Sequence, residues 1–210
     1  MSPVPVHLVD HPLVHDALVT LRDKRTGPDH FRRAATRISV LLAADALNDV
    51  RTNDVTVETP LGPAQGRRIA GDVVVVPVLR AGLGMLDAVL ELVPDARVGH
   101  IGLQRDELTA VASQYYSKLP SRLDASFVLM IDPMLATGGS AIAALDLLAH
   151  AGAKTIRMIC IVAAPEGVAL VEQRHPHVVI YTPVVDQRLN EHKYIVPGLG
   201  DFGDRLYGTV

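Results

Sequence analysis

The chain has 210 residues, of which 49% are hydrophobic, enough to bury the core of one domain. A net charge of −3 argues against a protein that mainly binds nucleic acid, because such proteins carry clustered basic surfaces. No apolar run approaches the ~20 residues of a membrane span, and the N-terminal residues lack a signal-peptide pattern. The single cysteine excludes an internal disulfide and suggests a reducing compartment, so we expect a cytoplasmic protein that binds no membrane.

Two amphipathic helices and a hairpin are predicted within residues 1–71. The apolar positions that share a helical face are Leu13, Ala17, Leu18 and Leu21 in the first helix and Phe31, Ala35, Ile38 and Leu42 in the second. Gly27-Pro28 separates the two helices. The hairpin comprises residues 55–59, a turn at 60–63, and a return over 67–69. It has few apolar side chains, so we expect it to need an external surface.

From Asp72 onward, strands and helices alternate through a predicted core of residues 72–182. Strands are expected at 73–79, 97–103, 127–131, 155–162 and 178–181, and helices at 83–92, 139–150 and 165–174. This alternation predicts an α/β fold with a mostly parallel sheet flanked by helices. Ligands of such sheets bind beyond the carboxyl ends of the strands.

Residues 105–126 are too long for an ordinary connection between a strand and a helix. A loop of this length is either a lid over a site or a plain surface excursion, and the residues alone favour neither.

The most informative segment is 126–141. A buried strand there ends in Asp132, and the loop Thr137-Gly138-Gly139-Ser140 leads into a helix. Bare backbone N–H groups and a helix N-terminus favour an anion, and the carboxylate can accept hydrogen bonds from neighbouring hydroxyls. A phosphorylated sugar offers both groups, whereas the alternative is an ordinary tight turn.

Three other features are better explained without a functional site. Cys160 lies in an apolar strand and is expected to be a buried, inert thiol. His175 and His177 would share a strand face, but two imidazoles without further ligands make a weak metal site, so we favour a surface location. Residues 198–203 match G-x-G-x-x-G, yet the chain lacks the long helix and the distant acid of a dinucleotide fingerprint.

Four separated motifs carry a family resemblance that covers nearly the whole chain. They are Val128-Leu-Met-Ile-Asp-Pro-Met-Leu-Ala-Thr-Gly-Gly-Ser140, Pro77-Val-Leu-Arg-Ala-Gly-Leu-Gly-Met85, Ala163-Ala-Pro-Glu-Gly167 and Asn190-Glu-His-Lys-Tyr-Ile-Val-Pro-Gly-Leu-Gly-Asp-Phe-Gly-Asp204. The chain resembles the type I phosphoribosyltransferases, and the Asp132-Pro133 pair resembles their uracil phosphoribosyltransferase branch. The resemblance implies a single domain with a β-hairpin arm that takes part in dimer contacts, and a C-terminal base-binding hood at residues 183–210.

The resemblance also implies roles for individual residues. Binding of phosphoribosyl diphosphate (PRPP) is expected from Arg80, Arg105, Asp132, Pro133, Met134, Leu135, Ala136, Thr137, Gly138, Gly139, Ser140 and Asp201. Catalytic contributions are expected from Asp132, Arg105 and Asp201. Uracil would contact Ile195, Gly200, Asp201 and Phe202, mainly through main-chain groups. Some relatives have a small residue where this chain has Phe202, which raises the question of pocket size.

The implied reaction joins uracil to PRPP and releases uridine monophosphate (UMP) and diphosphate. Mg²⁺ would be held by PRPP and water, without a dedicated protein site. A homodimer or higher homo-oligomer is expected, with GTP as an activator in some relatives. Two alternatives are an RNA-binding regulator on the same fold, which should have a basic face, and a nucleotide-binding oligomer without catalysis.

Overall fold

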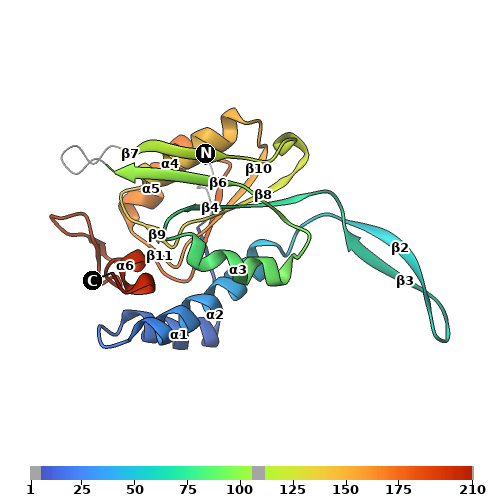
Figure 1. The fold of residues 1–210 in the computed structure, drawn as a ribbon, viewed down its shortest axis with the longest axis horizontal. Coiled ribbons are helices and arrows are strands. Elements are labelled where there is room, and N and C mark those ends of the chain that lie inside the picture. The colour runs from blue at the N-terminus through green and yellow to red at the C-terminus, as the bar shows by residue number, and fades with distance from the viewer. Residues whose placement is uncertain (1–5, 106–111, 210) are drawn as a thin grey trace.

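The computed structural model describes residues 6–209 except 106–111, and leaves the side chains of Arg105 and Ala112 undescribed. Its centre is one sheet with the strand order β1-β12-β10-β8-β4-β6-β7, in which β5 also pairs with β4 (Figure 1). The strands are β1 Val6–Leu8, β4 Val73–Leu79, β5 Arg97–Val98, β6 His100–Arg105, β7 Ala112–Lys118, β8 Phe127–Ile131, β10 Thr155–Ile159 and β12 Val179–Thr182. Every pairing is parallel except β6 with β7. The predicted α/β fold class is therefore confirmed.

Helices cover both faces of the sheet. On one face pack α1 Pro12–Arg22, α2 Pro28–Ala46 and α3 Leu83–Leu92, and on the other α4 Gly139–His150 and α5 Pro165–Arg174 (Figure 1). Strand β4 illustrates why the sequence forms a buried strand. Val75 joins the first core and Val74 and Val76 join the second, so apolar side chains are needed on both faces.

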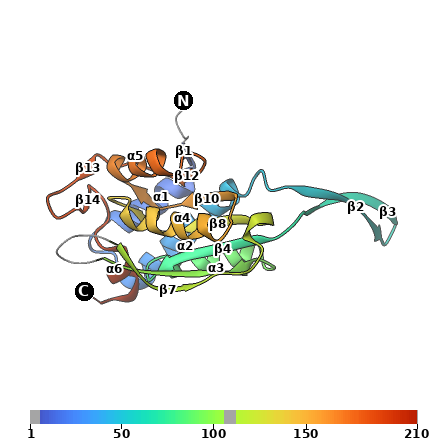
Figure 2. The ribbon, with the colours of Figure 1, turned by 90° about the horizontal axis from the view of Figure 1, so that it is seen from above.

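The arm consists of β2 Thr52–Thr59 and β3 Gly62–Ile69, paired antiparallel from Thr52 with Ile69 to Thr59 with Gly62. It projects from the body at the end opposite the hood, as Figures 1 and 2 both show. Most of its side chains are exposed, and Leu61 at its tip is fully so. The predicted hairpin is confirmed, and it is longer than the sequence pattern indicated.

Two expected elements differ from the structure. The single strand expected at 155–162 is divided, because β11 Val162–Ala163 leaves the main sheet and pairs with β9 Met134–Leu135. The stretch 105–126, expected to be either a lid or a surface excursion, contains a strand: β7 pairs antiparallel with β6, and a short 3₁₀ turn follows at Leu123–Ala125. Since Ser113 to Lys118 lie exposed on an edge strand, they lack the apolar alternation that marks a strand in sequence. Residues 106–111, near the start of the stretch predicted as a lid or a surface excursion, lie outside the described residues.

The remaining candidates also acquire positions. Cys160 is fully buried, as predicted, and burial raises the pKa of its thiol to about 12. His175 and His177 do not share a strand: His175 follows α5, and His177 precedes β12. His177 is exposed, whereas His175 is partly buried, with its side chain 13% exposed and its Nε2 2.9 Å from Asp146 Oδ1. Within the described residues, no helix has the length and apolar character needed to cross a membrane.

Candidate active site

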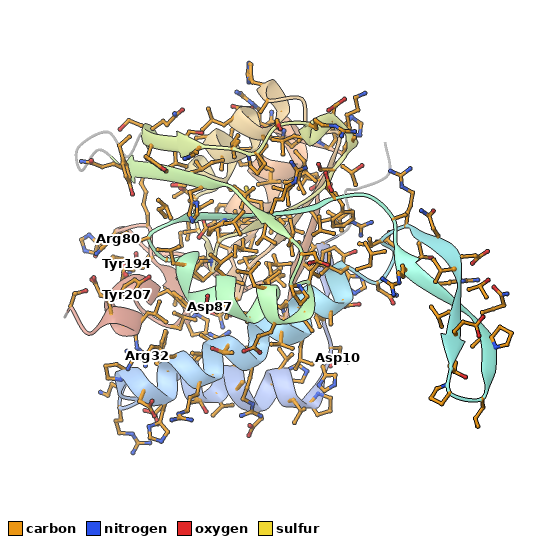
Figure 3. The ribbon with its side chains drawn as sticks, turned by 45° about the vertical axis from the view of Figure 1, so that its right-hand side comes forward. Asp10, Arg32, Arg80, Asp87, Tyr194 and Tyr207 are labelled. Carbon is orange, nitrogen blue, oxygen red and sulfur yellow. The ribbon has the colours of Figure 1, made fainter. Side chains whose placement is uncertain are left out.

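A cleft of about 400 Å³ opens at the carboxyl ends of β4 and β8. The loop that follows β8 forms the floor of the cleft, and the C-terminal hood forms the wall opposite that loop. Figure 3 shows Arg80, at the end of β4, on the same side of the molecule as Tyr194 and Tyr207 of the hood. The predicted site residues that line this cleft are Arg80, Asp132, Met134, Leu135, Ala136, Gly138, Ser140, Ile195, Gly200, Asp201 and Phe202.

The loop of residues 132–140, called here the acid–glycine loop, begins where β8 ends. Asp132 is only 9% exposed, and its Oδ1 accepts a hydrogen bond of 3.4 Å from Met134 N. Pro133 does not line the cleft, but its carbonyl oxygen accepts bonds from Ile161 N and Val162 N at 3.0 and 3.2 Å. These bonds, together with the pairing of β9 and β11, fix the loop backbone relative to the sheet.

The loop ends at the N-terminus of α4. Gly138 has φ of +85°, a left-handed conformation that residues with a Cβ rarely adopt, and Gly139 begins the helix. The first N–H groups of a helix have no intrahelical acceptor, so this end of α4 presents several donors. Thr137 and Gly139 do not line the cleft themselves; Gly139 N donates to Thr137 Oγ1 at 3.4 Å, a local bond that shapes the turn.

Arg80 is exposed immediately after β4, and its carbonyl oxygen accepts a hydrogen bond of 3.3 Å from Tyr207 Oη. The peptide bond between Leu79 and Arg80 is cis. The neighbouring glycines allow close packing. A Cβ at Gly82 would lie 2.6 Å from Ile131 O, and one at Gly84 would meet the side chain of Leu206.

Arg105 is the predicted residue with the least structural definition. Its backbone pairs with Ala112 at the end of β6, and β6 lies beside β4 in the sheet. The side chain lies outside the described part of the molecule, so its place in the site stays a prediction.

The hood supplies the opposite wall of the cleft. It comprises the short hairpin of β13 Arg188–Leu189 and β14 Ile195–Val196, a turn through Gly198 and Gly200, and α6 Phe202–Tyr207. Asp201 is the N-cap of α6, and its Oδ1 accepts a bond of 2.9 Å from Asp204 N. The helix has six residues, so the sequence 198–203 does not introduce the long helix of a dinucleotide site.

The position of Phe202 shows whether its large ring reduces the size of the pocket. The residue is 1% exposed, and its ring packs edge-on against Phe31 of α2, with 5.2 Å between the ring centroids. A Cβ at Gly84 of α3 would lie 3.3 Å from Phe202 Cε1. The ring thus belongs to the core between α2, α3 and α6, and it does not fill the cleft.

Several residues that support the hood were not found from the sequence. Arg205 donates to the carbonyl oxygens of Leu199 and Asp23, each at 2.7 Å, and also bonds the carbonyl of Leu21. Burial lowers the pKa of the Arg205 guanidinium, which lies 4.5 Å from the centroid of the Phe31 ring. Arg22 and Asp186 form a second support, described below. Arg22 and Asp186 are 164 positions apart, and Arg205 bonds Leu21 at a separation of 184 positions, so no local spacing could have revealed these contacts.

A family model described as "Uracil phosphoribosyltransferase" matches residues 8–209. Proteins named uracil phosphoribosyltransferase from Dictyoglomus thermophilum and Symbiobacterium thermophilum are 52% and 51% identical, each over 97% of this chain and 99% and 98% of those proteins.

The structural comparison agrees with the sequence comparison. The AQ2163 protein from Aquifex aeolicus superposes with a TM-score of 0.91 at 37% identity, over 95% of this chain and 96% of that one. An APRTase from Giardia lamblia, at 17% identity and a TM-score of 0.51 over 74% of this chain and 82% of that one, shows similarity of fold alone. By the family match and the close relatives together, the chain belongs to the uracil phosphoribosyltransferase family of pentosyltransferases.

Proposed function

We propose that this enzyme transfers the phosphoribosyl group of PRPP to N1 of uracil, producing UMP and diphosphate. The observation that carries the proposal is the shared cleft. The cleft lies between the acid–glycine loop, which ends at a helix N-terminus, and the backbone of the hood. Its volume of about 400 Å³ suits a small ligand.

The acid–glycine loop would hold the phosphoribosyl part. The 5′-phosphate would accept hydrogen bonds from backbone N–H groups between Ala136 and Ser140 and from the Thr137 and Ser140 hydroxyls. Asp132, immediately after the carboxyl end of β8, would accept hydrogen bonds from the ribose hydroxyls. Arg80, and Arg105 by family resemblance, would neutralise the leaving diphosphate, because a guanidinium binds pairs of oxygens.

The hood would hold the base. Uracil presents an acceptor, a donor and an acceptor along O2, N3–H and O4, and backbone groups of residues 194–202 can supply the complement. Ile195, Gly200, Asp201 and Phe202 all contribute to the cleft wall, which supports this assignment. Asp201 would lie near the reacting nitrogen and the ribose.

The chemistry then needs positioning more than proton transfer. The bond from the anomeric carbon to diphosphate breaks, the leaving group takes the electron pair, the bond to uracil N1 forms, and the N1 proton passes to the departing diphosphate or to water. If the sugar passes through an oxocarbenium-like state, the Asp132 carboxylate stabilises its positive charge.

Mg²⁺ fits this arrangement as a partner of PRPP. Asp132 and Asp201 both line the cleft, and carboxylate oxygens are ligands that magnesium prefers. Within the described residues, no group of three or more His, Cys, Asp or Glu side chains forms a metal cage. The ion would take most ligands from diphosphate, ribose and water, and when bound it would neutralise charge on the leaving group.

Assembly and regulation are further parts of the proposal. The projecting arm supports a homodimer or larger homo-oligomer, because its strands extend away from the body and leave their side chains exposed. A GTP effector is proposed from family resemblance alone.

The direct test is to incubate the enzyme with uracil, PRPP and Mg²⁺ and to measure UMP and diphosphate together. Equal amounts of the two products are expected. Diphosphate release without UMP, or uracil binding without turnover, would refute the proposed transfer.

A further inference from the structure

Arg22 and Asp186 form an ion pair beneath the hood that no step of the proposed reaction uses. Arg22 Nη2 lies 2.7 Å from Asp186 Oδ1, and Nη1 lies 3.0 Å from Oδ2. The Asp186 side chain is 4% exposed and that of Arg22 is 25% exposed. A pair so well shielded from water is worth more than a surface pair and is more sensitive to the loss of one partner.

The same pair binds both backbone groups of Gly198. Gly198 N donates to Asp186 Oδ2 at 2.8 Å, and Gly198 O accepts from Arg22 Nη1 at 2.9 Å. One peptide segment of the hood is thereby held from both sides by charge-assisted hydrogen bonds.

Gly198 packs closely against the wall of the cleft. It has φ of +57°, and a Cβ at this position would collide with the carbonyl oxygen of Ile195. Ile195 and Gly200, on either side of this turn, both line the cleft. A shift of Gly198 must therefore move the backbone assigned to uracil.

Asp186 is in turn fixed to the other half of the site. Asp186 N donates to Ala163 O at 2.8 Å, in β11, and β11 pairs with β9 inside the acid–glycine loop. The connection from the loop to the hood therefore runs through β11, Asp186 and Gly198.

We propose that Arg22 and Asp186 are positioning residues that set the hood backbone at the distance from the acid–glycine loop required for uracil recognition. The inference rests on the proposed function. Removing either partner should displace the hydrogen-bonding backbone of the hood while leaving the acid–glycine loop, which would hold most of PRPP, in place.

Steady-state kinetics of Asp186→Asn and Arg22→Met test this. We expect the KM for uracil to rise roughly tenfold or more, because a misplacement near 1 Å weakens a hydrogen-bonded site strongly, while the KM for PRPP changes less than about twofold. The preference for uracil over cytosine should fall as well. The double variant should lose less than the two single variants combined, since the residues act as one unit.

Asp16→Asn is the matched control, because it removes another ion pair of α1, with Arg37 of α2, that does not contact the hood. It should leave both KM values unchanged. If Asp186→Asn does not fold, Arg22→Met and the conservative Arg22→Lys decide the question.

A purely structural pair would lower the melting temperature while leaving the uracil KM and the base preference unchanged in assays below it. That result, or an equal rise of both KM values, overturns the positioning role. Absence of UMP formation by the unmodified enzyme is a different failure, which refutes the proposed function and with it this inference.

Discussion

At the scale of single residues, some of the residues around the cleft are proposed to act on the substrate, and others stabilise the fold. Asp132 and Phe202 are both nearly buried, at 9% and 1% exposure, and both come from motifs that resemble the family. Asp132 faces the cleft as a carboxylate, whereas the Phe202 ring packs into the core against Phe31. Substitutions of these two residues should therefore affect different measurements.

Asp132→Asn keeps the shape of the side chain and removes its charge. Hydrogen bonds to a charged group contribute about 1.5–3 kcal/mol, so turnover should fall roughly ten- to a hundredfold or more. Steady-state kinetics measure the fall, and circular dichroism checks that the variant is folded. A folded variant with full activity would remove Asp132 from the site.

Phe202→Ala should reduce stability more than specificity. Truncating a buried Phe typically costs about 3–5 kcal/mol, which urea unfolding would measure. The ratio of kcat/KM for 5-fluorouracil and uracil should remain near that of the unmodified enzyme, because the ring does not fill the cleft. A ratio that rises tenfold with little loss of stability would mean that the ring narrows the pocket.

The Cys160 thiol gives a prediction for alkaline pH. Burial raises its pKa from 9.0 to about 12 in the folded protein. The stability contributed by the buried, protonated thiol is therefore fully present below pH 9 and is lost as the pH rises towards 12. Iodoacetamide at pH 8 should leave the folded enzyme active and unlabelled and should label it after unfolding. Rapid labelling of the native enzyme would contradict the buried position.

At the scale of elements, the structure depends on close approaches that only glycine permits. α5 packs so closely on the acid–glycine loop that a Cβ at Gly167 would collide with Ala136 O. A Cβ at Gly138 would lie 3.1 Å from Gly167 O, and the φ of +85° would be strained for any residue that has a Cβ. The geometry of the loop is thus set by its contact with α5 as well as by its own sequence.

Gly138→Ala should therefore distort the end of the loop and the N-terminus of α4. We expect the KM for PRPP to rise roughly tenfold, since a left-handed residue with a Cβ costs ~1–2 kcal/mol and the contact adds to that. Gly66→Ala in the arm is the control, because a Cβ there meets no atom within 4 Å. An unchanged KM for PRPP in Gly138→Ala would show that the phosphate does not depend on this turn.

The sequence predicted most elements because their signals are local. The strand at 127–131 and the helices at 83–92, 139–150 and 165–174 have the predicted bounds, since runs of buried apolar residues and the glycine turn define them. Strand β7 was missed because its exposed side chains do not alternate, and the division at 155–162 depends on pairing with β9. The supports of the hood, Arg22, Asp186 and Arg205, depend on contacts between distant segments that no spacing rule can supply.

At the scale of the whole molecule, the arm and the hood lie at opposite ends of the α/β body (Figures 1 and 2). The body has its cores on both faces of the sheet, and neither core includes a buried residue of the arm. A two-stranded hairpin alone is at best marginally stable in water, so the arm fits a role in assembly.

Deleting 54–67 and joining Asn53 to Arg68 through Asn-Gly tests that role, because Asn53 and Arg68 are paired neighbours in the arm. The shortened protein should keep a melting temperature typical of the folded body and should sediment as a monomer, while the full chain sediments as an oligomer. Equal sedimentation of the two proteins would exclude the arm from the contact between subunits.

The selectivity between uracil and cytosine tests the central claim most directly. Cytosine has an amino group in place of O4 and an acceptor in place of N3–H, so two buried contacts with the hood backbone would become mismatched. Each unsatisfied buried group costs ~1–3 kcal/mol, and polar sites of this kind discriminate by ~10⁴ or more. We predict that kcat/KM for uracil, measured as UMP formation, exceeds kcat/KM for cytosine, measured as formation of cytidine monophosphate, by this factor. 5-Fluorouracil should react. Comparable rates for uracil and cytosine would contradict recognition of the base by the hood backbone.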